Sequence, residues 1–232
     1  MGQFRLWGVE HLAVLAAVLT LPAALAAFAR GHQRRSAVIG GVLAVLLAGN
    51  ELVWWLFRYR TEGLHLANLP LQVCDLTVWM GVWAAIWRRQ ACFEFLYFAG
   101  LAGGGMALLT PDLWAPWPSY PSVYYFLAHG LVVVLALFLV WGAGMRLTSR
   151  AVGRFLLIVN GYALGIAVFN TAFQTNYLYL CRKPEAPTLL DYLGPWPWYL
   201  AFGELAAAAL VVALWLPFSL RLRNWLAGRT AV

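Results

Sequence analysis

Seven apolar stretches separated by short polar segments restrict this sequence more than any other feature. Each is close to the length of about 20 residues that an α-helix needs to cross a bilayer. A backbone in lipid must satisfy its own hydrogen bonds, so such stretches cross as helices. They cover residues 8–28, 37–57, 69–87, 93–110, 123–142, 154–172 and 198–216. We therefore expect an all-α, polytopic transmembrane helical bundle of about seven helices, forming a single integral membrane domain over residues 1–232.

The composition agrees with a bilayer environment. Hydrophobic residues make up 63% of the chain and charged residues 11%, with a mean hydropathy of +0.73. A soluble domain averages about 25% charged residues. The net charge of +7 does not indicate a nucleic-acid partner, because the arginines stand in short patches between the apolar stretches.

Lysine and arginine are divided unevenly between alternate loops. The 30–35, 88–89 and 146–154 loops and the C-terminal tail together hold eleven, and the remaining segments hold five. By the positive-inside rule the eleven face the cytoplasm. An odd number of spans then puts the N-terminus outside and the C-terminus in the cytoplasm. We expect a multi-pass protein of the cell inner (plasma) membrane.

Polar side chains recur near the outer ends of these helices. Such groups are costly in hydrocarbon and usually face the bundle interior. At a rise of ~1.5 Å per residue, Cys74, His129 and Glu204 reach similar depths. The sequence therefore predicts a polar chamber in the outer half of the membrane. Its expected substrate-binding residues are Asn50, Glu51, Gln72, Asp75, Asn170, Gln174, Asn176 and Glu204.

Cys74 and His129 are the pair in this chamber that supports covalent chemistry. Asn68 and Pro70 predict a helix start just before Cys74, and a helix N-terminus favours a thiolate. His129 is a candidate base for that thiol. Three scattered cysteines and the absence of closely spaced ligands fit neither a disulfide framework nor a metal site. We expect no metal and no cofactor.

Other interpretations of the same residues remain open. A lone cysteine in a membrane helix is usually an inert, small apolar residue. Glu51, His129 and Glu204 also fit a non-enzymatic transporter or a small-molecule-binding membrane component that binds a cation or relays protons. In a structural or assembly factor, the chain's own side chains would fill the chamber.

Several segments resemble a known family. Residues 69–75 (LPLQVCD), 176–180 (NYLYL), 183–184 (KP) and 189–199 (LLDYLGPWPWY) resemble YwaF-type bacterial integral membrane proteins. The resemblance extends from about the second helix to the seventh. That family is similar to an animal endoplasmic-reticulum acyltransferase that makes polyunsaturated ether phospholipids through a cysteine. It is more distantly similar to the androgen-induced membrane hydrolases.

The resemblance implies that Cys74 is a nucleophile and His129 its base. The expected function is acyl transfer or acyl-ester hydrolysis on a membrane lipid, through a thioester on Cys74. The amides of Asn50, Asn170, Gln174 and Asn176 are expected candidates to stabilise the oxyanion. The sequence indicates no protein partner.

Overall fold

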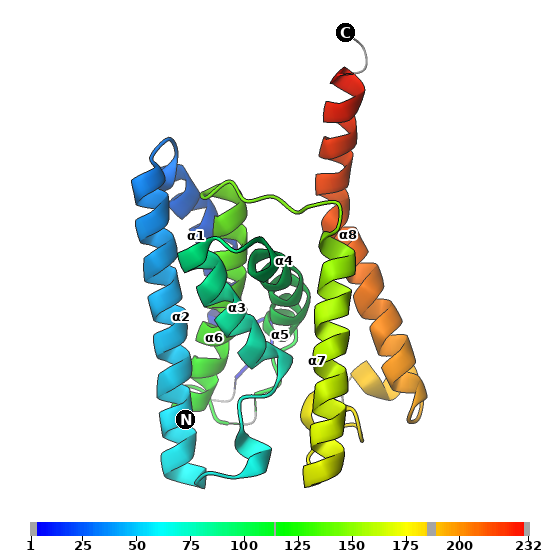
Figure 1. Ribbon diagram of the computed structural model, residues 1–232. Coiled ribbons are helices and arrows are strands. Elements are labelled where there is room, and N and C mark those ends of the chain that lie inside the picture. The colour runs from blue at the N-terminus through cyan, green and yellow to red at the C-terminus, as the bar shows by residue number, and fades with distance from the viewer. Residues whose placement is uncertain (1–3, 114, 185–188, 230–232) are drawn as a thin grey trace. The chain divides into compact units, whose positions relative to one another are not determined.

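The structure is a computed structural model that describes residues 4–113, 115–184 and 189–229. Within these ranges the chain forms helices and no β-strand (Figure 1). The elements are α1 (Val9–Ala29), α2 (Gln33–Glu62), the 3-10 turn η1 (Leu66–Asn68), α3 (Val73–Trp87), α4 (Gln90–Ala99), the π-helical turn η2 (Gly100–Gly104), α5 (Gly105–Leu109), α6 (Tyr120–Trp141), α7 (Ala151–Phe173), the 3-10 turns η3 (Tyr177–Tyr179) and η4 (Leu189–Leu193), and α8 (Trp198–Arg229).

Six helical stretches of the described chain are long and apolar enough to cross a membrane. They are α1, α2, the continuous stretch from α4 to α5, α6, α7 and the Trp198–Ser219 part of α8. The seventh predicted span corresponds to α3, an apolar helix of 15 residues. The expectation of a polytopic helical bundle is therefore confirmed.

Helix α3 begins later than the sequence predicted. The N–H of Leu71 donates to the carbonyl of Leu69 at 2.8 Å, which closes a three-residue turn around Pro70. Proline fits such a turn because its φ angle is fixed near the required value. The prediction of a helix start at Asn68 and Pro70 was therefore wrong. The helix begins at Val73, so Cys74 lies in its first turn.

The helices group into two compact units. The first unit consists of residues 1–64 and 73–145 and contains α1 to α6. The second consists of residues 65–72 and 146–232 and contains η1, α7, η3, η4 and α8. The single domain expected from the sequence stays a prediction.

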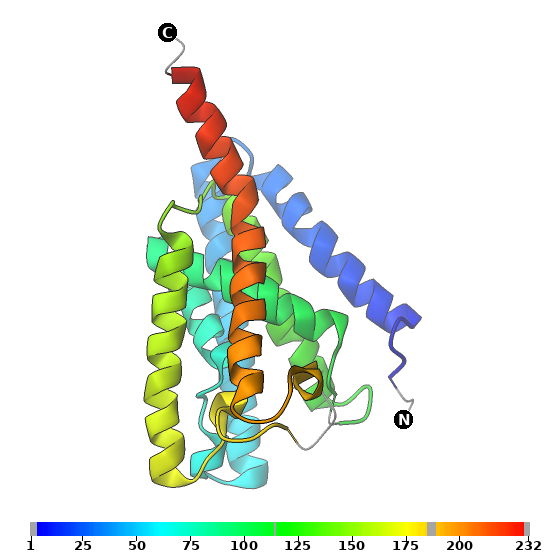
Figure 2. The same cartoon turned by 90° about the vertical axis from the view of Figure 1, so that its right-hand side faces the viewer.

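In the first unit, successive helices alternate in direction (Figures 1 and 2). Helices α4 and α6 form its centre, where the side chains of Phe93, Phe98, Leu135 and Phe138 are fully buried. Helix α2 packs against both α3 and α6, and α1 packs against α6. This arrangement brings the outer-half residues of α2, α3 and α6 together.

The glycine-rich part of the fourth predicted span forms a π-helical turn within a continuous helix. A Cβ atom on Gly100 would lie 2.7 Å from Cγ1 of Val132 in α6, and one on Gly104 would lie 3.6 Å from the carbonyl oxygen of His129. The absence of side chains therefore allows η2 to approach α6 closely, as small residues do between membrane helices.

In the second unit, α7 and α8 pack together and run antiparallel (Figure 2). The 65–72 segment is held against the α7 region by three hydrogen bonds. The hydroxyl groups of Tyr162 and Tyr177 donate to the carbonyl oxygens of Leu71 and Leu66, at 2.9 and 2.7 Å. The N–H of Leu178 donates to Oε1 of Gln72 at 3.2 Å. The loop that leads into α3 is thus tied to the second unit.

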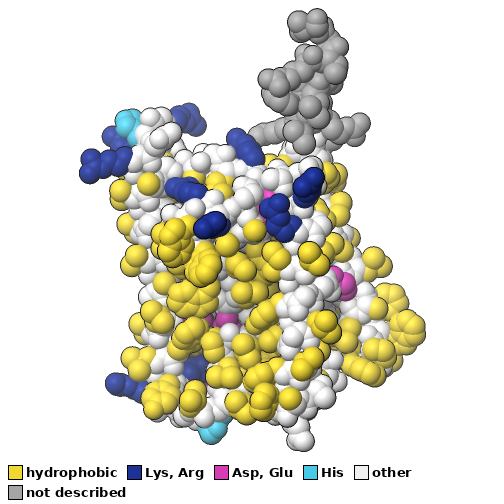
Figure 3. Space-filling view, in the orientation of Figure 1, with side chains coloured by type: hydrophobic (Ala, Val, Ile, Leu, Met, Phe, Trp, Pro, Cys, Tyr) yellow, Lys and Arg dark blue, Asp and Glu magenta, His cyan; other side chains and the backbone are white. Residues whose placement is uncertain are grey.

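The helix surfaces match a lipid environment. Hydrophobic side chains cover them, and lysine and arginine gather towards the helix ends (Figure 3). Val9, Val45 and Leu157 are more than two-thirds exposed, at 81%, 69% and 76%. Arg88 donates to the Ser36 carbonyl at 3.4 Å, so the α1–α2 and α3–α4 loops lie at the same end of the first unit. Which side of the membrane this end faces stays a prediction.

Candidate functional site

A cavity of about 120 Å³ lies between α2, α3, α6 and the π-helical turn of the first unit. Its wall is mainly apolar, and its side chains with reactive or polar atoms are few. The residues around it are Glu51, Val73, Cys74, Thr77, Val78, Ala99, Gly103, Gly104, Tyr124, Ala128, His129 and Val132.

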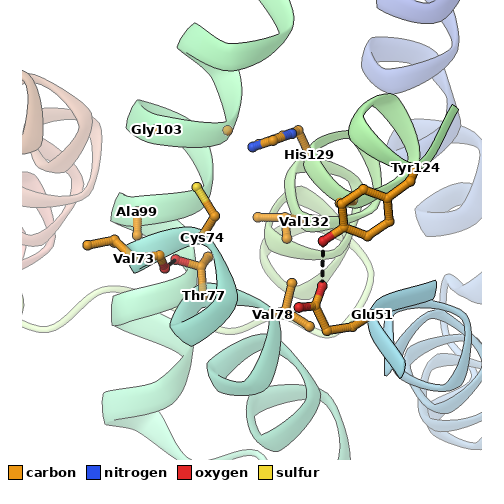
Figure 4. Close-up of a pocket in the computed structure, with 12 residues that line it drawn as sticks. Glu51, Val73, Cys74, Thr77, Val78, Ala99, Gly103, Tyr124, His129 and Val132 are labelled. Carbon is orange, nitrogen blue, oxygen red and sulfur yellow. Dashed lines mark hydrogen bonds between the residues drawn. The ribbon is translucent and has the colours of Figure 1, made fainter. Parts of the chain in front are cut away.

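Cys74 places a free thiol in this cavity. Its side chain is exposed, and Figure 4 shows Sγ directed into the open space beside Gly103. The backbone N–H of Cys74 itself is hydrogen-bonded to the thiol. Because Cys74 lies in the first turn of α3, its N–H is one of those that have no partner within the helix. The thiol therefore lies in an electropositive setting typical of reactive cysteines.

His129 faces the same space from α6 (Figure 4). Its Nδ1 lies 2.8 Å from the carbonyl oxygen of Tyr125. A carbonyl can only accept, so Nδ1 carries the proton and Nε2 has an available lone pair. Among the described residues, no hydrogen bond joins either ring nitrogen to Sγ of Cys74. Unliganded sites are often looser than the reacting complex.

Glu51 forms a hydrogen-bonded network at the cavity wall. Its carboxylate accepts from Nε1 of Trp55 at 2.7 Å and from the hydroxyl of Tyr124 at 2.8 Å. A third hydrogen bond joins it to the carboxyl group of Asp75. Trp54 stacks on the ring of Tyr124 with centroids 4.2 Å apart. Glu51 is fully buried, so its oxygens are engaged by protein groups.

Asn50 and Asp75 lie near these residues without lining the cavity. Asp75 follows Cys74 in α3 but is turned towards Glu51. Nδ2 of Asn50 is buried, and it has no hydrogen-bond partner in the described part of the chain. Neither side chain is placed by the structure to contact a molecule beside Cys74.

Asn170 and Asn176 serve the backbone of the second unit, so their predicted role in substrate binding was wrong. Oδ1 of Asn170 accepts from the hydroxyl of Thr175 and from the N–H of Tyr177, and its Nδ2 donates to the Tyr177 carbonyl. Asn176 bonds in the same way to the backbone of Cys181 and Arg182. Their amide groups are therefore occupied in shaping the turn after α7.

The remaining predicted residues also belong to the second unit. Gln72 accepts from the Leu178 N–H. Gln174 is exposed and ends α7 with a left-handed backbone, φ 54°. Glu204 is exposed and accepts from Nδ2 of Asn160 at 2.8 Å, whereas the sequence predicted that it would face the bundle interior. A neighbouring polar residue on α7 stabilises this carboxylate without burial.

Two residues of the site were missed by sequence reasoning. Tyr124 holds Glu51, and its position five residues before His129 on the same helix was an available signal. Gly103 lines the cavity, and an added Cβ there would meet no atom within 4 Å. No sequence pattern distinguishes Gly103 from its glycine neighbours, because the difference arises from the π-helical register.

A family comparison agrees with the membrane fold. The model of the TMEM164 family matches residues 6–215. The chain belongs to the TMEM164 family. The match spans the cavity residues of this TMEM164 family member and nearly all of the α-helical stretches described above. Neither the curated proteins nor the solved structures gave a match to the chain. The relationship to YwaF-type proteins and to an acyltransferase stays a prediction.

Proposed function

We propose that this TMEM164 family member catalyses acyl transfer or acyl-ester hydrolysis on a membrane lipid, with Cys74 as nucleophile and His129 as base. The observation that carries the proposal is the shared cavity: the Cys74 thiol and the unprotonated Nε2 of His129 open into one apolar space. The surrounding apolar wall suits an acyl chain, and the charge distribution of the loops supports the inner (plasma) membrane as its location.

The reaction has two balanced halves. His129 Nε2 removes the thiol proton as Sγ attacks the ester carbonyl, and the same proton is returned to the alkoxide that leaves. The acyl group is then a thioester on Cys74. Water or an acceptor hydroxyl gives its proton to His129 and attacks the thioester, which restores the cysteine after proton return. The free N–H groups of the first turn of α3 stabilise the oxyanion in both halves.

The contacts of the carboxylates favour this proposal over a transporter. A cation or proton pathway through Glu51, His129 and Glu204 needs carboxylates that a passing ion can reach. Glu51 is fully buried with its oxygens bonded to Trp55 and Tyr124, and Glu204 is bonded to Asn160 in the second unit.

Covalent labelling tests the proposal. Purified protein is treated with an acyl-chain activity probe, and the labelled residue is mapped by mass spectrometry. We expect Cys74→Ala to abolish labelling and Cys92→Ala and Cys181→Ala to retain it. Cys181 is the sharper control, because it is also an exposed free thiol. Labelling that survives Cys74→Ala, or no labelling of the wild-type protein, would reject the mechanism.

A further inference from the structure

Glu51 and Asp75 form a carboxyl pair inside the membrane bundle. A hydrogen bond between two carboxyl groups requires a proton on one of them, and two like charges this close cannot both be ionised. The pair thus carries one proton and at most one negative charge. The remaining acceptor capacity of Glu51 is satisfied by Trp55 and Tyr124.

These contacts connect three helices around the cavity. Glu51 and Trp55 belong to α2, Asp75 to α3 and Tyr124 to α6. Asp75 is the residue after Cys74, and successive side chains on a helix point about 100° apart. Fixing Asp75 towards α2 therefore fixes the direction in which Cys74 points. Tyr124 lies little more than one turn before His129, so the same carboxylate is attached to both helices of the proposed pair.

We infer that Glu51 is a positioning residue that holds the Cys74-bearing turn of α3 at a set angle to the His129-bearing helix α6. The inference rests on the proposed function, because it concerns the orientation of that nucleophile. Glu51 acts through its hydrogen bonds and not by contact with substrate, since its side chain is fully buried. An amide can replace a protonated carboxyl in such a network, because it also has one donor group and one acceptor.

The test is the rate at which iodoacetamide alkylates Cys74 in the full chain. Cys92→Ala and Cys181→Ala are introduced first, so that Cys74 is the remaining thiol. We expect Glu51→Gln to react within about twofold of this parent. Glu51→Leu is expected to react about 10-fold more slowly or worse, since misplacement of about 1 Å can cost about 10²-fold. Equal slowing by Gln and Leu, or no slowing by Leu, would overturn the inference.

A double-mutant cycle separates positioning from general loss of structure. If Glu51 acts through the Cys74–His129 pair, adding Glu51→Leu to His129→Ala should slow alkylation little further. Fully additive effects would overturn the inference. If His129→Ala alone leaves the rate unchanged, the proposed base fails, while the comparison of Gln with Leu still decides the role of Glu51.

A milder variant covers the case in which Glu51→Leu does not fold. Tyr124→Phe removes the hydroxyl that donates to Glu51 and keeps the ring stacked on Trp54. Tyr125→Phe is the matched control, because its hydroxyl donates to the Ala107 carbonyl instead. We expect slower alkylation in the first and not in the second. Equal rates in both variants would count against the positioning role.

Discussion

Replacing Asn170 with alanine tests whether this residue shapes the turn after α7 or serves a substrate. Asn170 is 1% exposed, and its side chain forms three hydrogen bonds. Alanine would leave the N–H and carbonyl of Tyr177 and the hydroxyl of Thr175 without these partners. Tyr177 and Thr175 are themselves buried, at 4% and 9% exposure, so water cannot readily replace the lost groups.

An orphaned buried polar group costs about 1–3 kcal/mol. Three such groups lower the free energy of opening this turn by about 3–6 kcal/mol, taking the lower part of that range for each. Each 1.4 kcal/mol corresponds to a factor of about ten. We therefore expect amide hydrogen exchange of the peptide covering residues 174–182 to accelerate about 10²-fold or more in Asn170→Ala. Hydrogen–deuterium exchange mass spectrometry of the protein in detergent measures this directly.

Asn160→Ala is the matched control. Asn160 lies on the same helix, but it is exposed and donates to Glu204 and to the Leu156 carbonyl. Its removal should leave exchange in residues 174–182 unchanged. The structural argument for Asn170 is refuted if exchange in Asn170→Ala stays at the wild-type rate. Loss of acyl labelling with unchanged exchange would return Asn170 to the role of an oxyanion donor.

Two further predictions concern the cavity. His129→Ala should lower the rate of acyl labelling about 10²-fold or more, as removal of a general base typically does, while thermal unfolding in detergent stays close to wild type; a labelling rate within a few-fold of wild type would contradict this. Gly103→Leu should shift acyl probe preference towards shorter chains by about 10-fold, the effect of adding apolar groups to a binding pocket. Gly105→Leu is its control, because the Gly105 position is equally open but does not line the cavity. Identical chain-length profiles in both variants would show that the acyl chain lies elsewhere.

The sequence predicted the spans well because apolar length alone determines which segments cross a bilayer. It also predicted that Glu51, Cys74 and His129 would lie at one depth, since the rise per residue of a helix is fixed. It could not show which way each side chain turns. Asn170 and Asn176 had the right depth for the chamber, but the chain reverses immediately after them and its backbone takes their amide groups. Tyr124 was indistinguishable from an interfacial aromatic until the helices were packed.

Helix α3 shows a second limit of the sequence. Pro70 is compatible both with a first helical turn and with a tight turn before the helix. The choice depends on partners far along the chain, because Tyr162, Tyr177 and Leu178 bind the segment that precedes Val73. Local signals alone therefore placed the helix start four residues too early.

The π-helical turn η2 has a consequence for insertions and deletions in this part of the chain. Such a turn accommodates one more residue than α geometry over the same length. Since each residue advances an α-helix by about 100°, deleting one glycine would change the phase of α5 relative to α4 by that angle. The carbonyl of Leu108, which lies 2.7 Å from Nε2 of the buried His11, would then point away from α1. The docking of the first helix is therefore in phase with the cavity wall by virtue of a single additional residue.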